Sequence, residues 1–404
     1  MTVPASPTAT TRRGSRRTGL PGPLAVGLVV VLVALVETSA EAGALTALAA
    51  GGVAWAAPDA MDRVVKRAFT VYGFRLESGH VLPEMTLAYE TYGQLAPDGA
   101  NAILVTHGFT SSGHAAGRYA PADPAPGFWN ALIGPGKAID TQRYFVVASN
   151  MLGSSHGSTA PASIDPRTGK RYGPTFPDIT LRDIVTAQKA LLEGLGVRRL
   201  VAVAGPSYGG FQAFQWAVTY PGFMRGIVAA VSAPRASRGP GVEALVRTFA
   251  ADPDWNGGWH YDSGGIPATM AALRYDTLLR YGQNEALARR YPDPAARQAR
   301  LREMAEAWAR QFDPNSLIVL RKAALKFDVE GDLSKIRARV LYVLSRTDRV
   351  FPPSLGPRVM DRLARAGVDA RYFEIDSEFG HTAHGTDAAK WAPALRAFLE
   401  SLDR

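Results

Sequence analysis

Residues 200–210 read Leu-Val-Ala-Val-Ala-Gly-Pro-Ser-Tyr-Gly-Gly. Leu200–Ala204 is an apolar run typical of a buried strand, and Gly210–Thr219 has its apolar residues at helical spacing. Ser207 therefore falls on the turn between a strand and a helix, where Gly205 and Gly209 allow the chain to turn sharply. This arrangement exposes a serine hydroxyl at the end of a strand, and it predicts that Ser207 is a nucleophile.

A second Gly-x-Ser-x-Gly pattern, at residues 153–157, does not have the same context. Ser155 is followed by the turn-rich stretch Thr159–Gly169 and by no helical pattern. Because the motif requires a strand before the serine and a helix after it, we interpret Ser155 as part of a structural turn.

Short apolar runs alternate with helical patterns on both sides of Ser207, as in a mostly parallel sheet flanked by helices. Thr180 begins one of these helices, with Asp183 completing a capping-box-like start. Between Pro234 and about Ile336 the strand pattern gives way to helical stretches joined by Pro/Gly-rich segments. We therefore expect an α/β-hydrolase fold with a core at 58–235 and 336–404 and an inserted helical lid at 236–335. The expected strands are 86–91, 102–106, 144–149, 200–204, 226–231, 340–344 and 371–375, and the expected lid helices are 285–290, 294–312 and 317–327.

A serine nucleophile needs a base, and the base needs an orienting acid. In this fold the partners follow in the order Ser, Asp, His, on loops after later strands. Asp348 follows the strand 340–344, and His381 follows the strand 371–375 with Gly380 before it. His384 is the competing base, and Asp376 is better interpreted as an ordinary loop residue.

Acyl transfer also needs backbone N–H groups that bind the developing oxyanion. The N–H of Tyr208, directly after the nucleophile, is one candidate. The loop His107-Gly108-Phe109-Thr110 makes the N–H of Phe109 the second, with a plain turn after the strand as the alternative.

The N-terminal 57 residues have the pattern of an export signal. Four arginines between Arg12 and Arg17 precede the apolar run Leu24–Val36, and Ala42 and Ala56 end small-residue cleavage motifs. The expected location is secreted or periplasmic. An uncleaved membrane anchor and a disordered leader remain alternatives.

Composition narrows the classes of function. The chain has no cysteine, so it has neither a disulfide nor a thiol nucleophile, and its histidines show no metal-ligand spacing. The net charge of +9 is scattered and not interleaved with aromatic residues, which argues against nucleic acid as a partner. We expect a small-molecule acyl ester or thioester substrate, no metal and no cofactor. The oligomeric state is open, with a homodimer as one candidate. Contact with a membrane is expected only through an uncleaved leader.

Several further segments together resemble the homoserine O-acetyltransferase family of the α/β-hydrolase superfamily. They are Leu87–Gly93, His107–Thr110, His114–Gly117, Ile133–Asp140, Gly157–Thr159 and Phe312–Ser316. The resemblance implies that Ser207, Asp348 and His381 form the triad, that acetyl-CoA acylates the serine, and that homoserine accepts the acetyl group.

Two departures concern the acceptor. Thr382 stands where the family carries an aspartate that holds the amino group of homoserine. Arg247, the nearest candidate for the carboxylate-binding arginine, lies one position late relative to Asp252-Pro253. Together with the expected export, these departures favour hydrolysis, with water as the acceptor. Acetyltransfer of the family type is the alternative, and a non-catalytic binding protein is a remote one.

Overall fold

The computed structural model describes residues 61–403 except 62, 238 and 240. The predicted leader, residues 1–57, lies outside the described residues. Among those described, no helix is both long and apolar enough to cross a membrane.

One eight-stranded sheet forms the core, in the order β1-β2-β6-β3-β9-β10-β11-β12. The pairings β1–β2 and β2–β6 are antiparallel, and all the others are parallel. The strands are β1 (Arg67–Arg75), β2 (Val81–Tyr92), β3 (Ala102–Val105), β6 (Phe145–Ser149), β9 (Leu200–Pro206), β10 (Met224–Ala230), β11 (Arg339–Ser345) and β12 (Ala370–Ile375). This mostly parallel sheet, flanked by helices, confirms the predicted α/β-hydrolase fold.

Both faces of the sheet are covered by helices. Neighbouring residues of a central strand point to opposite faces and therefore pack in different apolar clusters. Leu104 packs in one apolar cluster and Ile103 in the other. The first cluster takes side chains from α1 (Leu181–Gly194), α2 (Tyr208–Thr219) and α8 (Leu355–Arg365), and the second from α10 (Ala392–Ser401). The central strands are therefore buried on both faces, which explains their continuous apolar sequence.

Helix α1 begins where the sequence predicts. Thr180 is its N-cap, and the side chain accepts a hydrogen bond from the Asp183 N–H while the Asp183 carboxylate accepts one from the Thr180 N–H. This is a complete capping box, so the predicted start of the helix is confirmed.

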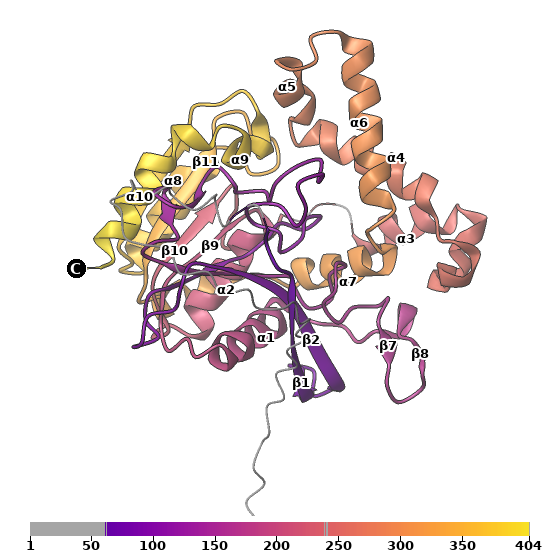
Figure 1. Cartoon of the computed structure of the whole chain (residues 1–404), viewed down its shortest axis with the longest axis horizontal. Helices are drawn as coiled ribbons and strands as arrows, with labels where there is room; N and C mark the ends of the chain where they lie inside the picture. Colours follow the sequence, from indigo (N-terminus) through magenta and orange to yellow (C-terminus); the bar gives the residue numbers. More distant parts are fainter. Residues whose placement is uncertain (1–60, 62, 238, 240, 404) are drawn as a thin grey trace, which may run out of the picture. The chain divides into compact units, whose positions relative to one another are not determined.

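Among the described residues between β10 and β11 there are five α-helices, besides short 3-10 helices. They are α3 (Val242–Ala250), α4 (Pro267–Arg280), α5 (Gln283–Ala288), α6 (Pro294–Ala309) and α7 (Pro314–Leu325). Figure 1 shows α4, α5 and α6 grouped apart from the sheet, with α7 nearer to it. Helices α3 and α4 were not among the lid helices expected from the sequence. We call these helices the lid.

The two chain segments that lead into and out of the lid, around Arg235 and Asp328, pair with each other, and we call this pairing the neck. Arg235 and Asp328 form an isolated antiparallel bridge. Around it, the Ala236 N–H donates to the Phe327 carbonyl at 3.2 Å and the Val329 N–H donates to the Pro234 carbonyl at 3.0 Å. The two ends of the lid segment therefore lie side by side.

Candidate active site

Ser207 occupies a strained turn between β9 and α2. Its φ is 56° and its ψ is −119°, a conformation that is rare for a residue with a side chain. Gly205 and Gly209 flank it, and a Cβ on either glycine would come within 2.7 Å of Thr106 at the end of β3. Glycine is thus required at both positions, because the neighbouring strand passes too close for a side chain.

His381 and Asp348 are brought together at the carboxyl ends of β12 and β11. His381 Nδ1 lies 2.8 Å from Asp348 Oδ2, and both side chains are buried. The other carboxylate oxygen, Oδ1, accepts hydrogen bonds from the N–H groups of Val350 at 2.7 Å and Phe351 at 3.2 Å. The aspartate is therefore fixed on both sides, and it can hold the imidazole with Nε2 left for proton transfer.

The competing candidates have other partners. The Trp129 indole N–H donates to His384 Nδ1 at 3.0 Å, and burial lowers the pKa of His384 to about 3. Asp376 is exposed and pairs with Arg346. The Ser155 hydroxyl accepts the N–H of Asp313, the N-cap residue of lid helix α7, at 2.9 Å. Ser155 thus joins the core to the lid, and no helix follows it.

The loop after β3 approaches the nucleophile. A Cβ on Gly108 would lie 3.8 Å from Ser207 Cβ, so the loop passes beside the turn that carries the serine. Among the described residues, no acceptor takes the N–H of Phe109. The N–H of Tyr208 belongs to the first residue of α2 and so has no carbonyl partner within its own helix. Both predicted oxyanion donors therefore lie in segments that meet at Ser207.

His107 orients the Phe109 N–H, a role that the sequence analysis missed. The Met151 N–H donates to His107 Nε2 at 3.0 Å, which leaves the ring proton on Nδ1. Nδ1 lies 2.9 Å from the Gly108 carbonyl oxygen and donates to it. That carbonyl and the Phe109 N–H belong to one trans peptide unit and point in opposite directions, so holding one directs the other. Burial lowers the pKa of His107 to about 3, which keeps the ring neutral. In the sequence, the position of His107 directly after a buried strand and before Gly108 was the feature that could have indicated this role.

Aromatic rings connect the oxyanion loop to the triad histidine. Phe109 stacks on Tyr208, with ring centroids 5.8 Å apart, and Tyr208 contacts Phe211. Phe211 contacts Phe351, which in turn stacks on His381 at 5.7 Å. The three segments that carry Phe109, Ser207 and His381 are thus packed through one continuous apolar wall.

The structure separates Arg247, the predicted carboxylate-binding arginine, from a second arginine that lies beside the oxyanion loop. Arg247 lies on α3 with an exposed side chain, because Phe249 is the residue that this helix buries. Arg274, on α4, is the arginine beside the oxyanion loop. Its Nη1 donates to the Thr110 hydroxyl at 2.6 Å, and its guanidinium carbon lies 5.2 Å from the centre of the Trp308 ring.

Arg274 is enclosed without a carboxylate. Its Nε is buried and has no hydrogen-bond partner, and desolvation lowers the pKa of the guanidinium. No acidic side chain of the described chain forms an ion pair with it. The sequence signal was an arginine within a buried helical stripe, four residues after Met270 and three before Thr277.

Thr382 lies next to the same lid helix. Its N–H donates to the carbonyl of Tyr281, the C-cap of α4, at 3.1 Å, and its hydroxyl donates to the Phe379 carbonyl at 2.8 Å. The Tyr281 ring packs on His381 with centroids 4.7 Å apart. The residue that departs from the family pattern is therefore close to the triad and to the end of α4.

The fold and the site define an enzyme of the α/β-hydrolase class. The family model described as "alpha/beta hydrolase fold" matches residues 101–388. A homoserine O-acetyltransferase of Symbiobacterium thermophilum is 39% identical over 353 residues, which cover 81% of this chain and 92% of that protein. Other curated relatives at 35–38% identity carry the same name. The chain belongs to the homoserine O-acetyltransferase family.

Two solved structures of different activity are similar to this chain. Esterase E22 is 32% identical with a TM-score of 0.76, and the match covers 83% of this chain and all of that one. The homoserine O-acetyltransferase from Bacillus anthracis is 29% identical with a TM-score of 0.75, covering 83% and 98%. The chain is thus an acyltransferase or a hydrolase. The curated relatives favour the transferase over the hydrolase that the sequence analysis preferred.

Proposed function

We propose that this enzyme transfers an acyl group from an ester or thioester to the hydroxyl of an amino acid of the homoserine type, through an acyl-enzyme on Ser207. The observation that carries this proposal is the enclosed guanidinium of Arg274. Burying a guanidinium without a carboxylate partner is costly, and its planar donors suit a carboxylate in a bidentate arrangement. A carboxylate-bearing acceptor would supply the missing partner beside the oxyanion loop.

In the first half-reaction Ser207 Oγ attacks the acyl carbonyl and His381 Nε2 takes its proton. Asp348 holds the imidazole by Nδ1 and stabilises the imidazolium that forms. The N–H groups of Tyr208 and Phe109 bind the oxyanion of the tetrahedral intermediate. The leaving group departs with the proton from His381, and the acyl group remains on Ser207. The family resemblance makes acetyl-CoA the expected donor.

The carboxylate site is tested by two matched arginine variants. Arg274→Gln should reduce kcat/KM for homoserine by roughly ten- to a hundredfold, because a hydrogen bond to a charged group is worth about 1.5–3 kcal/mol. Arg247→Gln, in the exposed position, should leave it unchanged. O-acetylhomoserine formed from acetyl-CoA is measured by mass spectrometry, alongside p-nitrophenyl acetate hydrolysis without acceptor. A large loss in Arg247→Gln, with none in Arg274→Gln, would overturn this assignment.

Ester hydrolysis is the second candidate, and Thr382 favours it. A threonine supplies no negative charge for an ammonium group, and esterase E22 is similar to this chain over most of its length. If water is the natural acceptor, the unsubstituted enzyme should hydrolyse p-nitrophenyl acetate and form no O-acetylhomoserine at any homoserine concentration. Efficient formation of O-acetylhomoserine would reject this candidate.

A further inference from the structure

Thr110 is the residue through which the oxyanion loop contacts the lid. Its hydroxyl accepts a hydrogen bond from Arg274 Nη1 at 2.6 Å, and its carbonyl accepts one from the Trp308 indole N–H at 2.9 Å. Tyr281, at the end of the same lid helix as Arg274, packs its ring on His381. One threonine therefore bonds two lid residues, Arg274 and Trp308, and it directly follows Phe109, a candidate oxyanion donor.

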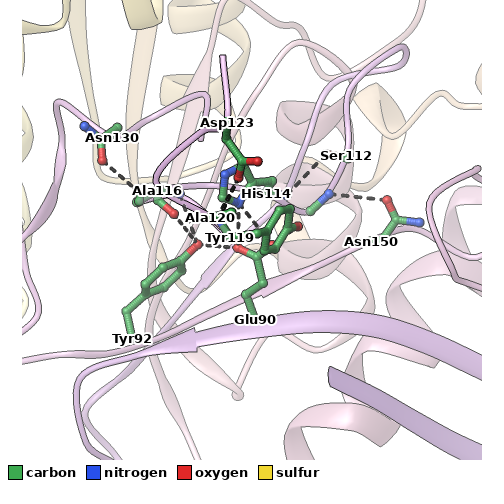
Figure 2. A network of polar contacts seen from close by, with 12 residues as sticks. Glu90, Tyr92, Ser112, His114, Ala116, Tyr119, Ala120, Asp123, Asn130 and Asn150 are labelled. Carbon is green, nitrogen blue, oxygen red and sulfur yellow. Dashed lines mark hydrogen bonds and ion pairs between the residues drawn. The ribbon is translucent and has the colours of Figure 1, made fainter. Parts of the chain in front are cut away.

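The far end of this loop is fixed to the sheet by a buried carboxylate. Glu90 on β2 accepts hydrogen bonds from the hydroxyls of Tyr92 and Tyr119, and His114 Nδ1 lies 3.2 Å from both of its oxygens (Figure 2). The Tyr92 hydroxyl also accepts the N–H of Ala116 at 3.0 Å. The loop is therefore anchored to the core after Thr110 as well as at His107 before it.

Because the loop is anchored, the Thr110 hydroxyl sets the direction of the Arg274 guanidinium. The five N–H donors of a guanidinium lie in a rigid planar fork, so fixing Nη1 restricts the others too. The Arg274 guanidinium, which would bind the carboxylate of the acceptor, is thereby held at a fixed position relative to the Gly108–Phe109 peptide that binds the oxyanion. No carboxylate of the described chain forms an ion pair with the Arg274 guanidinium and so turns it in another direction.

We propose that Thr110 is a positioning residue that decides whether the acyl group on Ser207 passes to an alcohol acceptor or to water. This inference rests on the proposed function. With the acceptor carboxylate on Arg274, the acceptor hydroxyl is held at the acyl carbonyl. Its oxygen forms the new C–O bond and its proton passes to His381 Nε2. The bond from Ser207 Oγ to the acyl carbon breaks, and the proton returns to Oγ.

Water undergoes the same step and yields the free acid. Water needs no cation to position it, whereas the alcohol acceptor depends on the position and direction of the Arg274 guanidinium. A misplacement of about 1 Å can reduce the rate of a positioned reaction about a hundredfold. Loss of the Thr110 hydroxyl should therefore slow transfer far more than hydrolysis.

Thr110→Val tests this inference, because valine keeps the shape of the side chain and the backbone bond to Trp308. Thr110→Ser is the conservative variant, since it keeps the hydroxyl. Thr186→Val is the matched control, because the Thr186 hydroxyl on α1 is likewise hydrogen-bonded to a distant side chain, that of Tyr220 at 2.9 Å, but away from the oxyanion loop. Three quantities are measured: the ratio of O-acetylhomoserine to acetate, the KM for homoserine, and the burst rate of acylation by p-nitrophenyl acetate.

In Thr110→Val the ratio should fall on the order of ten- to a hundredfold and the KM should rise, with a much smaller change in the burst rate. Thr110→Ser should restore the ratio, and Thr186→Val should match the unsubstituted enzyme. An unchanged ratio in Thr110→Val, or equal losses of transfer and acylation, would overturn the inference alone. Absence of O-acetylhomoserine with the unsubstituted enzyme would overturn the proposed function and this inference together.

Discussion

Ser207 holds a backbone conformation that a residue with a side chain adopts only under constraint. Such a residue costs of order 1–3 kcal/mol, which the surrounding structure has to offset. Here the Ser207 N–H donates to the Ala230 carbonyl at 2.8 Å, and the Ser232 hydroxyl donates to the Ser207 carbonyl at 2.7 Å. The backbone is therefore held by the last residue of β10 and by Ser232 just after that strand, independently of the Ser207 side chain.

Because the side chain is not needed for the turn, Ser207→Ala should fold normally and lose activity. Removing a triad nucleophile or its base costs about a millionfold in kcat in the best-studied case, and the two act as a unit, so His381→Ala should lose a similar factor. Steady-state hydrolysis of p-nitrophenyl acetate is the measurement, with circular dichroism as the check on folding. Ser155→Ala is the control and should retain turnover. The reverse pattern would place the nucleophile at Ser155.

Thr382→Asp should strengthen binding of an amino-acid acceptor. A carboxylate beside the end of α4 can pair with an ammonium group, and a charge-assisted hydrogen bond of about 1.5–3 kcal/mol corresponds to roughly ten- to a hundredfold. The KM for homoserine should fall by that factor, and Thr382→Asn, which adds no charge, should not reproduce it. If both variants behave alike, the acceptor amine does not lie at residue 382.

At the scale of single elements, the sequence predicted best where the signal is local. The start of α1 follows from Thr180 and Asp183, three residues apart, and β9 and α2 follow from the apolar pattern on either side of Ser207. The place of Arg274 in the buried stripe of α4 was a local signal, but its role was missed because its partner Thr110 is 164 residues away in the chain. The choice of Arg247 relied on its distance from Asp252-Pro253, but in the structure α3 turns that side chain outward.

The capping box of α1 gives a stability prediction for one element. Thr180→Ala removes an acceptor for the first turn of the helix and should lower the free energy of unfolding by about 1 kcal/mol. Thr180→Ser, which keeps the hydroxyl, should lose less. Urea unfolding followed by circular dichroism measures both. Equal losses in the two variants would show that the methyl group matters more than the cap.

For the whole molecule, two buried neutral histidines should make stability fall in acid. His107 and His384 have pKa values lowered to about 3, mainly by desolvation, against about 6.5 in an unfolded chain. Between these values the unfolded state binds protons that the folded state does not. The stabilisation is therefore complete above about pH 6.5 and declines as the pH falls towards 3, by about 1.4 kcal/mol per pH unit for each histidine.

His384→Gln isolates one of these contributions, because glutamine also offers an acceptor to the Trp129 indole but does not titrate. Its unfolding free energy should depend on pH less steeply than that of the unsubstituted protein, by about 1.4 kcal/mol per unit in the acid range. Urea unfolding at several pH values is the measurement. Parallel curves for the two proteins would show that His384 is not neutral in the folded state.

The predicted N-terminal leader bears on the acyl donor, because acetyl-CoA and homoserine are cytoplasmic metabolites. The sequence predicts that the mature protein begins after Ala42 or near Ala56 and lies outside the cytoplasm. N-terminal sequencing of the protein from its native host is the check. An intact Met1 in a soluble cytoplasmic fraction would contradict export, and it would strengthen acetyl-CoA as the donor.

The neck at Arg235 and Asp328 has a consequence for how acceptor preference diverges among relatives. The two ends of the lid segment lie side by side. The helices between them can therefore be replaced as one continuous segment by a single recombination event. Arg274 and Tyr281 belong to the exchanged segment. The triad residues belong to the core of the recipient protein: Ser207, Asp348 and His381. A chimera should therefore take the triad and residue 382 from one parent and the arginine for the acceptor carboxylate from the other, provided that the recipient has a threonine at the position of Thr110.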